Sequence, residues 1–331
     1  MTLALALLLT ARAQEAAEEP ADLPELWVGG GISGGIATSQ SGGLTSADST
    51  TTQAELDGAI GWGWGHARVD LDLHFDPTLG ADGVGVYPSP WPEWAMVQLG
   101  REKYHLRLGI FNPNIGLEDW DPWVNYAPTY STNFIYAGAG RFLGGEASMT
   151  TDGGVDLFAF GGYDVDWEAV GGGVGIATSQ DAFSTWSGLF VYPEFTTGCP
   201  GGAAKCLYAG AAIAFEFYPA SFLTIDIDTV SGIRDSSVFT SEQLVVNVIP
   251  EAVVNPFLRA ELAIDPDGVL GAPDGTASVG ATSDMTDWLR VALEGKAMFA
   301  GGATDLGGAL VISAHVPEPI PYSYQDPFGT D

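Results

Sequence analysis

Basic residues and long apolar runs are both scarce in this sequence, and each scarcity excludes a class of function. The 331 residues include 11 Lys and Arg against 42 Asp and Glu, so the formal net charge is −31. Binding to nucleic acid requires clustered Lys and Arg that neutralise phosphates, and docking on anionic lipid requires them too. No nucleic-acid partner is therefore expected. A run of about 18 apolar residues is also missing, so no transmembrane helix is expected.

Charged residues of either sign are few, whereas glycine is abundant. Charged residues make up 16% of the chain, against about 25% in typical soluble domains, and 46% of the residues are hydrophobic. The 45 Gly residues are about twice the usual share. A protein that presents part of its outside to lipid needs little surface charge, so the composition favours a membrane protein.

Cysteine and histidine are rare as well. The two cysteines, Cys199 and Cys206, lie seven positions apart, which in an exported chain predicts a small disulfide clip on a loop. Neither has a histidine nearby, and the four histidines show no metal-ligand spacing. No metal site and no cofactor are expected.

The N-terminus has the features of an export signal. Residues 3–9 form an apolar run, and Ala11-Arg12-Ala13 is an A-x-A cleavage site. We therefore predict a signal peptide over residues 1–13, followed by an acidic N-terminal periplasmic arm over residues 14–25. A short hydrophobic N-terminal helix is the alternative.

Alternation of apolar and polar residues with a period of two runs through most of the chain. In one segment, Ala67, Val69, Leu71, Leu73 and Phe75 alternate with His66, Arg68, Asp70, Asp72 and His74. The pattern returns at residues 53–64, 104–110, 207–217, 223–228, 258–264 and 289–299. Successive side chains of a strand point to opposite faces, so these segments are predicted as strands with one apolar and one ionisable face.

Three features favour a membrane barrel over a soluble sandwich. Many segments have the length of about 9–11 residues that a tilted strand needs to cross a bilayer. Short turns alternate with long connections, which are expected at residues 38–51, 76–92, 112–140, 193–205, 231–241 and 266–282. Aromatic residues near strand ends suggest interfacial girdles: Trp62, Trp64, Phe75, Trp94, Tyr104, Trp186, Tyr192 and Tyr218. Residues 26–331 are predicted to form an all-β, closed, antiparallel transmembrane β-barrel of 14–16 strands, with short periplasmic turns and long extracellular loops.

One stretch resembles a known family. It begins Gly109-Ile110-Phe111-Asn112-Pro113-Asn114-Ile115-Gly116-Leu117-Glu118 and continues with Tyr130-Ser131-Thr132-Asn133-Phe134-Ile135-Tyr136. These segments resemble the strand end, Pro-Gly-Glu motif and Ser-rich stretch of the OmpL-like putative β-barrel porins. The resemblance covers about 35 residues, and the rest of the chain shares only general barrel character with the family. The resemblance implies a bacterial outer-membrane porin without catalysis.

The longest predicted loop, residues 112–140, carries Glu118, Asp119 and Asp121. Our hypothesis is that these acids enter the pore as a constriction opposite inward basic residues, where a transverse field would favour cations. The alternative is an external loop over the rim. The other predicted pore-lining residues are Arg68, Asp70, Asp72, His105, Arg107, Glu146, Asp226, Asp228, Arg259, Glu261, Arg290 and Glu294. Charge is tolerated wherever a side chain meets water, so many of these could serve only to solvate the wall.

The sequence thus predicts an outer-membrane porin that passes small hydrophilic solutes or ions by passive diffusion and prefers cations. Its expected partners are outer-membrane lipid, small polar solutes or cations, and other copies of itself in a homo-trimer. The alternatives are a non-conducting structural or adhesive barrel, a secreted soluble β-protein and a barrel-based hydrolase. A hydrolase would need a Ser-His or Asp-His set facing lipid or the external rim, whereas the four histidines mostly point to the lumen by parity. The G-x-S-x-G motif at residues 31–35 would require a turn from strand to helix, and no helical pattern follows it.

The constriction hypothesis predicts the effect of removing the loop charges. We expect the combined variant Glu118→Gln, Asp119→Asn and Asp121→Asn to be less cation-selective, because fewer negative charges would face the permeating ion. The reversal potential in a planar bilayer under a salt gradient measures this selectivity. An unchanged reversal potential would remove these acids from the constriction.

Overall fold

The chain folds as a β-structure in one continuous sheet. The computed structural model describes residues 25–41, 44–49, 52–62, 64–76, 85–88, 92, 94–101, 103–113, 115, 140–196, 199–248, 254–267, 273–286 and 288–316. The first strand segments are β1 (Glu25–Ser41), β2 (Leu44–Ser49), β3 (Thr52–Trp62), β4 (Gly65–Asp76), β5 (Gly85–Pro88) and β6 (Trp94–Arg101). The next are β7 (Tyr104–Phe111), β8 (Phe142–Thr150), β9 (Val155–Asp164), β10 (Ala169–Gln180), β11 (Phe183–Phe195) and β12 (Cys206–Ala220). The last are β13 (Leu223–Arg234), β14 (Ser237–Val248), β15 (Val254–Ile264), β16 (Gly275–Thr286), β17 (Leu289–Ala300) and β18 (Ala303–Val316).

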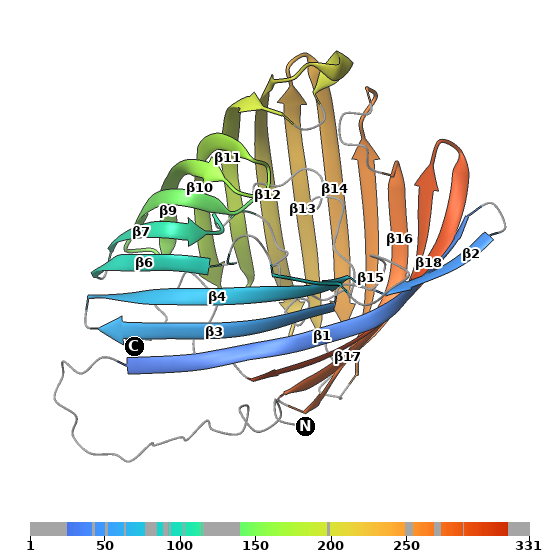
Figure 1. The fold of residues 1–331 in the computed structure, drawn as a ribbon, viewed down its shortest axis with the longest axis horizontal. Coiled ribbons are helices and arrows are strands. Elements are labelled where there is room, and N and C mark those ends of the chain that lie inside the picture. Colours follow the sequence, from blue (N-terminus) through green and yellow to red (C-terminus); the bar gives the residue numbers. More distant parts are fainter. Residues whose placement is uncertain are drawn as a thin grey trace.

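The eighteen segments make a closed barrel of sixteen antiparallel strands. β2 and β3 both pair with β1, and β5 and β6 both pair with β4, so each of these couples is one interrupted strand. β18 pairs with β1 from Gly30↔Val316 to Gln40↔Leu306, and this ladder closes the sheet. Figure 1 shows the wall running from blue β1 through green β9 to red β18 beside β1. The predicted fold class is confirmed at the upper end of the predicted strand range.

Helix is nearly absent from the described residues, which contain one short 3-10 turn, η2 (Pro200–Gly202). No described helix has the length and apolarity needed to cross a membrane.

The period-two pattern separates two faces. On β13, Ile227 and Ile233 are 39% and 37% exposed, whereas Asp226 and Asp228 are buried. The outer face of the barrel exposes large apolar side chains on nearly every strand, such as Leu26 on β1 and Leu293 on β17. The ionisable side chains point inward, because adjacent residues of a strand lie on opposite faces.

Connections of unequal length join the strands at the two ends. One end carries short turns such as 101–104, 180–183 and 220–223, together with strand ends Glu25 and Val316. The other carries the longer connections 76–85, 111–142, 195–206 and 264–275. The predicted long loop over residues 231–241 is wrong, because β13 and β14 pair as far as Arg234↔Ser237 and are joined by two residues. The predicted loop over residues 38–51 is also mostly strand, in β1 and β2.

The strand that sequence patterns missed is β16. The predicted loop over residues 266–282 contains the first part of this strand, and a short turn then leads into β17. The turn at Gly301 and Gly302 consequently lies at the end of the longer connections, although it is itself short. With β16 counted, sixteen strands are complete at Val316.

Aromatic rings pack against glycines on the inner face of β10. A methyl group built on Gly171 would lie 2.4 Å from Tyr192 Cδ1, and one on Gly175 would lie 2.1 Å from Phe158 Cζ. Gly173 is enclosed in the same way by Phe160 and by the Leu189 carbonyl oxygen. The glycine-rich segment therefore provides room for large rings from β9 and β11, as glycines do where another group approaches the backbone closely.

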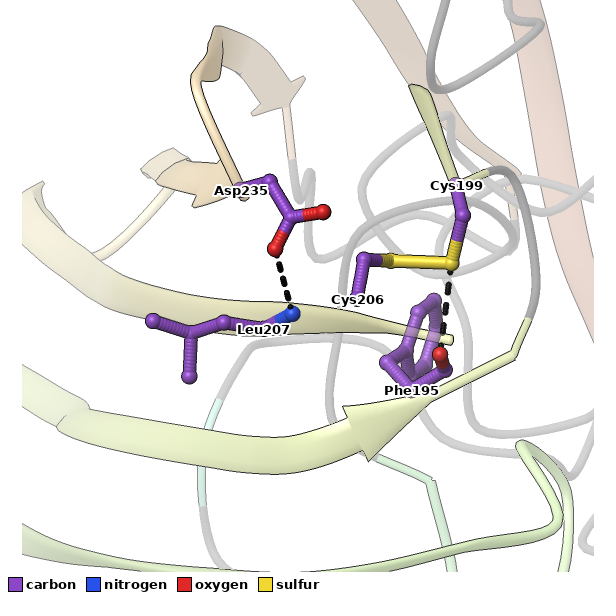
Figure 2. Close-up of a disulfide and its surroundings, with 5 residues drawn as sticks. All are labelled: Phe195, Cys199, Cys206, Leu207 and Asp235. Carbon is purple, nitrogen blue, oxygen red and sulfur yellow. Dashed lines mark hydrogen bonds between the residues drawn. A yellow bond between two sulfur atoms is a disulfide. The ribbon is translucent and has the colours of Figure 1, made fainter. Parts of the chain in front are cut away.

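The predicted disulfide is present. Cys199 and Cys206 are bonded with a Cα–Cα distance of 5.7 Å, and the bridge spans η2 in the connection between β11 and β12. Figure 2 shows the disulfide beside Phe195, with the Leu207 N–H donating to Asp235 Oδ1 at 2.8 Å. The bridge therefore secures the start of β12 at the end of the longer connections.

Because only some glycines are enclosed by other atoms, replacing a glycine by alanine should destabilise the barrel at enclosed positions and not at open ones. Gly173→Ala would place a methyl group 2.1 Å from a backbone oxygen, so we expect a loss of about 1–3 kcal/mol in unfolding free energy. Urea unfolding in detergent, followed by tryptophan fluorescence, measures the loss. Gly58→Ala is the matched control, since a methyl group there meets no atom within 4 Å. Equal stability of the two variants would contradict the packing argument.

Candidate functional site: the inner wall of the barrel

The inner face of the wall collects the ionisable residues that the sequence singled out. Strand alternation places eleven of them on this face, and all but two are buried: Arg68, Asp70, His105, Arg107, Glu146, Asp226, Asp228, Arg259, Glu261, Arg290 and Glu294. His105 and Arg290 are intermediate in exposure. Asp72 is part of β4, but its side chain lies outside the described part of the structure. Glu118, Asp119 and Asp121 also lie outside the described residues.

A stacked cluster joins β4, β6, β7 and β8. The guanidinium carbons of Arg68 and Arg107 lie 5.4 Å and 5.5 Å from the centre of a Trp94 ring. Arg68 forms an ion pair with Asp70 at 2.6 Å, and Arg107 lies 3.8 Å from Glu146 Oε1. Two arginines are thus held on one wall by an aromatic ring and two carboxylates. Trp94 was predicted to lie in an interfacial girdle, but it faces inward between these arginines.

A second cluster lies on β15 and β17. Arg259 donates from Nη2 to Glu294 Oε1 at 2.7 Å and lies 3.1 Å from Glu261 through Nε. The side chains of Arg259, Glu261 and Glu294 are 1%, 4% and 0–1% exposed, so the group is enclosed. One arginine therefore forms ion pairs with two carboxylates in this cluster.

A third group is acidic and lies on β12 and β13. Glu216 and Asp226 are directly opposite residues of the β12–β13 ladder, and Asp228 is on the same face two residues along. β13 lies half-way round the closed sheet from β4, and β15 lies half-way round from β7. The wall that carries Asp226 and Asp228 therefore faces the strand that carries Arg68.

Aromatic rings line the inner face between β8 and β14. The fully buried members include Phe142, Tyr192 and Tyr208, with Tyr192 and Tyr208 stacked at 5.6 Å between ring centres. Arg234 lies 4.8 Å from the centre of the Tyr208 ring and 5.0 Å from that of Phe195. Tyr192 was also predicted in a girdle and is instead part of this buried cluster. These rings gather toward the end of the wall that carries the longer connections, whereas Glu216, Asp226 and Asp228 lie on β12 and β13 nearer the short turns.

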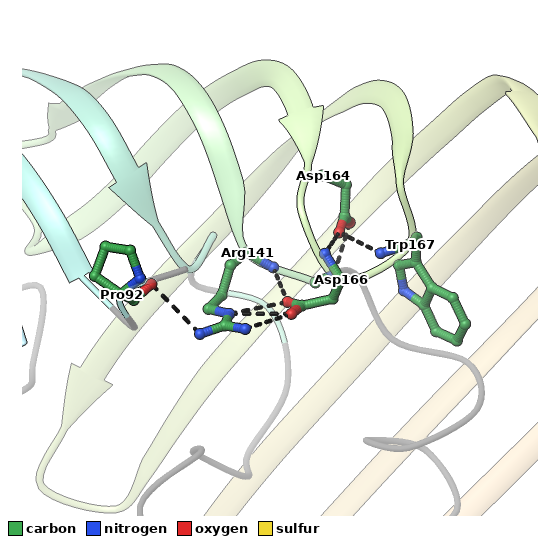
Figure 3. A network of polar contacts seen from close by, with 6 residues as sticks. Pro92, Arg141, Asp164, Asp166 and Trp167 are labelled. Atoms are coloured by element: carbon green, nitrogen blue, oxygen red, sulfur yellow. Dashed lines mark hydrogen bonds and ion pairs between the residues drawn. The ribbon is translucent and has the colours of Figure 1, made fainter. Parts of the chain in front are cut away.

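A polar network joins the start of β8 to the turn after β9. Arg141 donates from Nη2 to Asp166 Oδ1 at 2.6 Å, and its backbone N–H donates to Asp166 Oδ2 at 2.7 Å. Asp164 accepts from the backbone N–H groups of Gly140 and Trp167 and from Tyr192 Oη. Figure 3 shows Arg141 between Asp166 and the Pro92 carbonyl oxygen, its acceptor at 3.4 Å. The network fixes the point at which the chain enters β8.

The chain that leaves β7 turns toward the inside of the barrel. Ile115 packs against the buried aromatic cluster. A methyl group built on Gly188, which is on the inner face of β11, would lie 2.7 Å from Ile115 Cδ1. Because β7 and β11 are separated by three intervening strands, this contact requires Ile115 to reach across the interior.

Several inner-wall residues have no signal in the sequence. Arg141 and Arg234 were missed because each stands at a strand end outside an alternating run, and Asp164 because its acceptor role depends on a turn. The described residues contain no group of three or more His, Cys, Asp or Glu side chains arranged to hold a metal ion. The G-x-S-x-G motif at residues 31–35 lies within the strand β1, so no strand-to-helix elbow exists there.

Comparison with known proteins identifies the fold. No protein-family model and no curated protein sequence matches this chain. Among solved structures, an anion-selective porin from Comamonas acidovorans is 13% identical and has a TM-score of 0.65, covering 89% of this chain and 100% of that chain. OmpF of Salmonella typhi, in complex with daunomycin, is 12% identical with a TM-score of 0.64, over 89% and 100% of the two chains. The outer-membrane channel DcaP of Acinetobacter baumannii is 12% identical with a TM-score of 0.60, over 88% and 97%. The chain has the fold of bacterial outer-membrane porins.

The Arg259 cluster predicts a large effect from a single substitution. Arg259→Met would leave Glu261 and Glu294 buried without their cation, so we expect a loss of roughly 3–5 kcal/mol in unfolding free energy. Adding Glu261→Gln and Glu294→Gln should restore part of that loss. Urea unfolding in detergent measures both. The control is Lys205→Gln, since the Lys205–Glu194 ion pair is exposed and its removal should leave the midpoint unchanged. If Arg259→Met and Lys205→Gln lowered the unfolding free energy equally, the Arg259 cluster would contribute no more to stability than an exposed ion pair.

Proposed function

We propose that this protein is a bacterial outer-membrane channel through which small hydrophilic solutes or ions diffuse passively. The observation that carries the proposal is the closed barrel of sixteen strands with an apolar outer face and an ionisable inner face. A closed sheet leaves no unpaired edge in lipid, and barrels of about this strand number can enclose an aqueous channel. The porin fold of the solved structures supports the same function.

We further propose a preference for cations. Inner-face carboxylates include Asp57, Asp70, Glu146, Glu216, Asp226, Asp228, Glu261, Glu294 and Asp305. Inner-face basic residues on the strands are Arg68, Arg107, Arg234, Arg259, Arg290 and Lys296. The comparison porin from Comamonas acidovorans is described as anion-selective, so similarity of fold does not determine the sign of selectivity. The acidic inner wall supports the opposite sign in this protein.

The segment of residues 112–140 is proposed to narrow the channel. The support is the contact of Ile115 with the inner face of β11, together with the network that holds Gly140 and Arg141 at the other end of the segment. A segment fixed at these two points can lie inside the barrel. Glu118, Asp119 and Asp121 would then be available to the permeating ion.

The remaining predictions concern location and assembly. Export through a signal peptide over residues 1–13, an outer-membrane location and a homo-trimer all agree with the porin fold and are part of the proposal. Membership of the OmpL-like family remains a prediction.

Conductance in a planar bilayer tests the proposed function. We expect the purified protein to insert with stepwise conductance, and the reversal potential under a salt gradient should have the sign for a cation-selective pore. A reversal potential of the opposite sign would reject the cation preference, but the proposal of a channel would stand. Insertion without any conductance would reject the channel and favour a non-conducting barrel. The burial of the inner-wall side chains is the observation that supports this alternative.

A further inference from the structure

The acidic group on β12 and β13 contains a carboxylate without a partner. Asp226 is 3% exposed, and neither of its side-chain oxygens has a hydrogen-bond partner in the described structure. A buried carboxylate normally has a hydrogen bond or a counter-charge, because removing it from water is costly. Among the described residues Asp226 has neither, so a proton or a cation from outside the described side chains has to offset its charge.

The residues around Asp226 provide further oxygen atoms. Glu216 lies directly opposite Asp226 in the ladder, and opposite residues of antiparallel strands have Cβ atoms about 4.5–5.5 Å apart. Tyr218 Oη donates to Glu216 Oε2, and Ser184 Oγ lies 3.3 Å from Tyr218 Oη. Carboxylate and water oxygens are among the ligands that hard cations such as Ca²⁺ prefer, and other neutral oxygen atoms can add to them.

The basic side chains described on β11 to β15 do not pair with Asp226. Arg234 is the one basic residue in the sequences of β11 to β14, and it lies over aromatic rings at the far end of β13. Arg259 is in the same row as Asp226 two strands away, through Val245. It is held by Glu261 and Glu294. The positive charge that Asp226 requires therefore has to come from solution.

We propose that Glu216 and Asp226 form a binding site for a divalent cation of the Ca²⁺ class on the inner wall. Two adjacent carboxylates match the charge of one such ion, and hydroxyl and water oxygens would complete its coordination. In a conducting barrel, the bound ion would cancel two negative charges on this wall and lower cation selectivity. The binding site requires only the folded barrel wall, so it would be present whether or not the barrel conducts ions.

Terbium luminescence tests the site in the purified barrel in detergent micelles. Tb³⁺ occupies Ca²⁺-type oxygen sites, and Tyr218 beside Glu216 is placed to transfer excitation to it. We expect saturable luminescence that Ca²⁺ displaces, with affinity lowered at least about tenfold by Asp226→Asn and by Glu216→Gln, since each removes a ligand. Glu242→Gln is the matched control, because Glu242 is on β14 next to the site but faces outward.

The outcomes separate this inference from the proposed function. Unchanged Tb³⁺ and Ca²⁺ affinity in Asp226→Asn and Glu216→Gln would overturn the site and assign the pair a shared proton instead. An equal loss in Glu242→Gln would also overturn it, because binding would then follow overall charge. Urea unfolding of each variant checks that the barrel is intact. Binding is measured without a bilayer, so a barrel that binds Ca²⁺ but does not conduct contradicts only the proposed channel.

Discussion

Closure of the sheet by the β1–β18 ladder is the constraint on which the rest of the structure depends. An open sheet of this size would present unpaired N–H and C=O groups at two edges, and lipid offers no partner for them. Once the ladder from Gly30 to Gln40 is formed, each strand has a fixed inside and a fixed outside. A register shift of one residue would place every carboxylate of a strand on the apolar face. The ion pairs of Arg107 with Glu146 and of Arg259 with Glu294 join different strands and therefore depend on this register.

The inner wall is divided into sectors of different chemistry. Between β8 and β14 the wall holds aromatic rings, which lie over glycines such as Gly173 and Gly210 and leave little room for other atoms. Arg234 is placed over three of these rings, and Ile115 packs against the same cluster. The same strands carry Glu216, Asp226 and Asp228 nearer the short turns, and the ion pairs of Arg68 and Arg259 lie on other strands. A chain segment that enters the barrel as Ile115 does therefore finds an apolar surface near the longer connections.

The sequence predicted the barrel because period-two alternation persists wherever one face is apolar and the other ionisable. It missed β16 because Gly275–Thr286 has small or polar residues on both faces, so the alternation is weak. The two-residue turn after Arg234 was obscured by serines and threonines that are typical of loops. The inward position of Trp94 and Tyr192 was also unpredictable, since a ring at a strand end suits a girdle and an interior equally well. The Arg259–Glu294 pair joins residues 35 apart, and only strand order brings them together.

The charge balance of the wall follows from these pairings. A buried ion pair contributes little net stability, because the desolvation of both groups offsets their attraction. It does cancel charge, and Arg68, Arg107 and Arg259 each lie against at least one carboxylate. The carboxylates that these arginines neutralise contribute little to the electrostatic field inside the barrel. Selectivity in the proposed channel should therefore depend less on the total of −31 than on acids without such a partner, and Asp226 opposite Glu216 is the clearest case in the described wall.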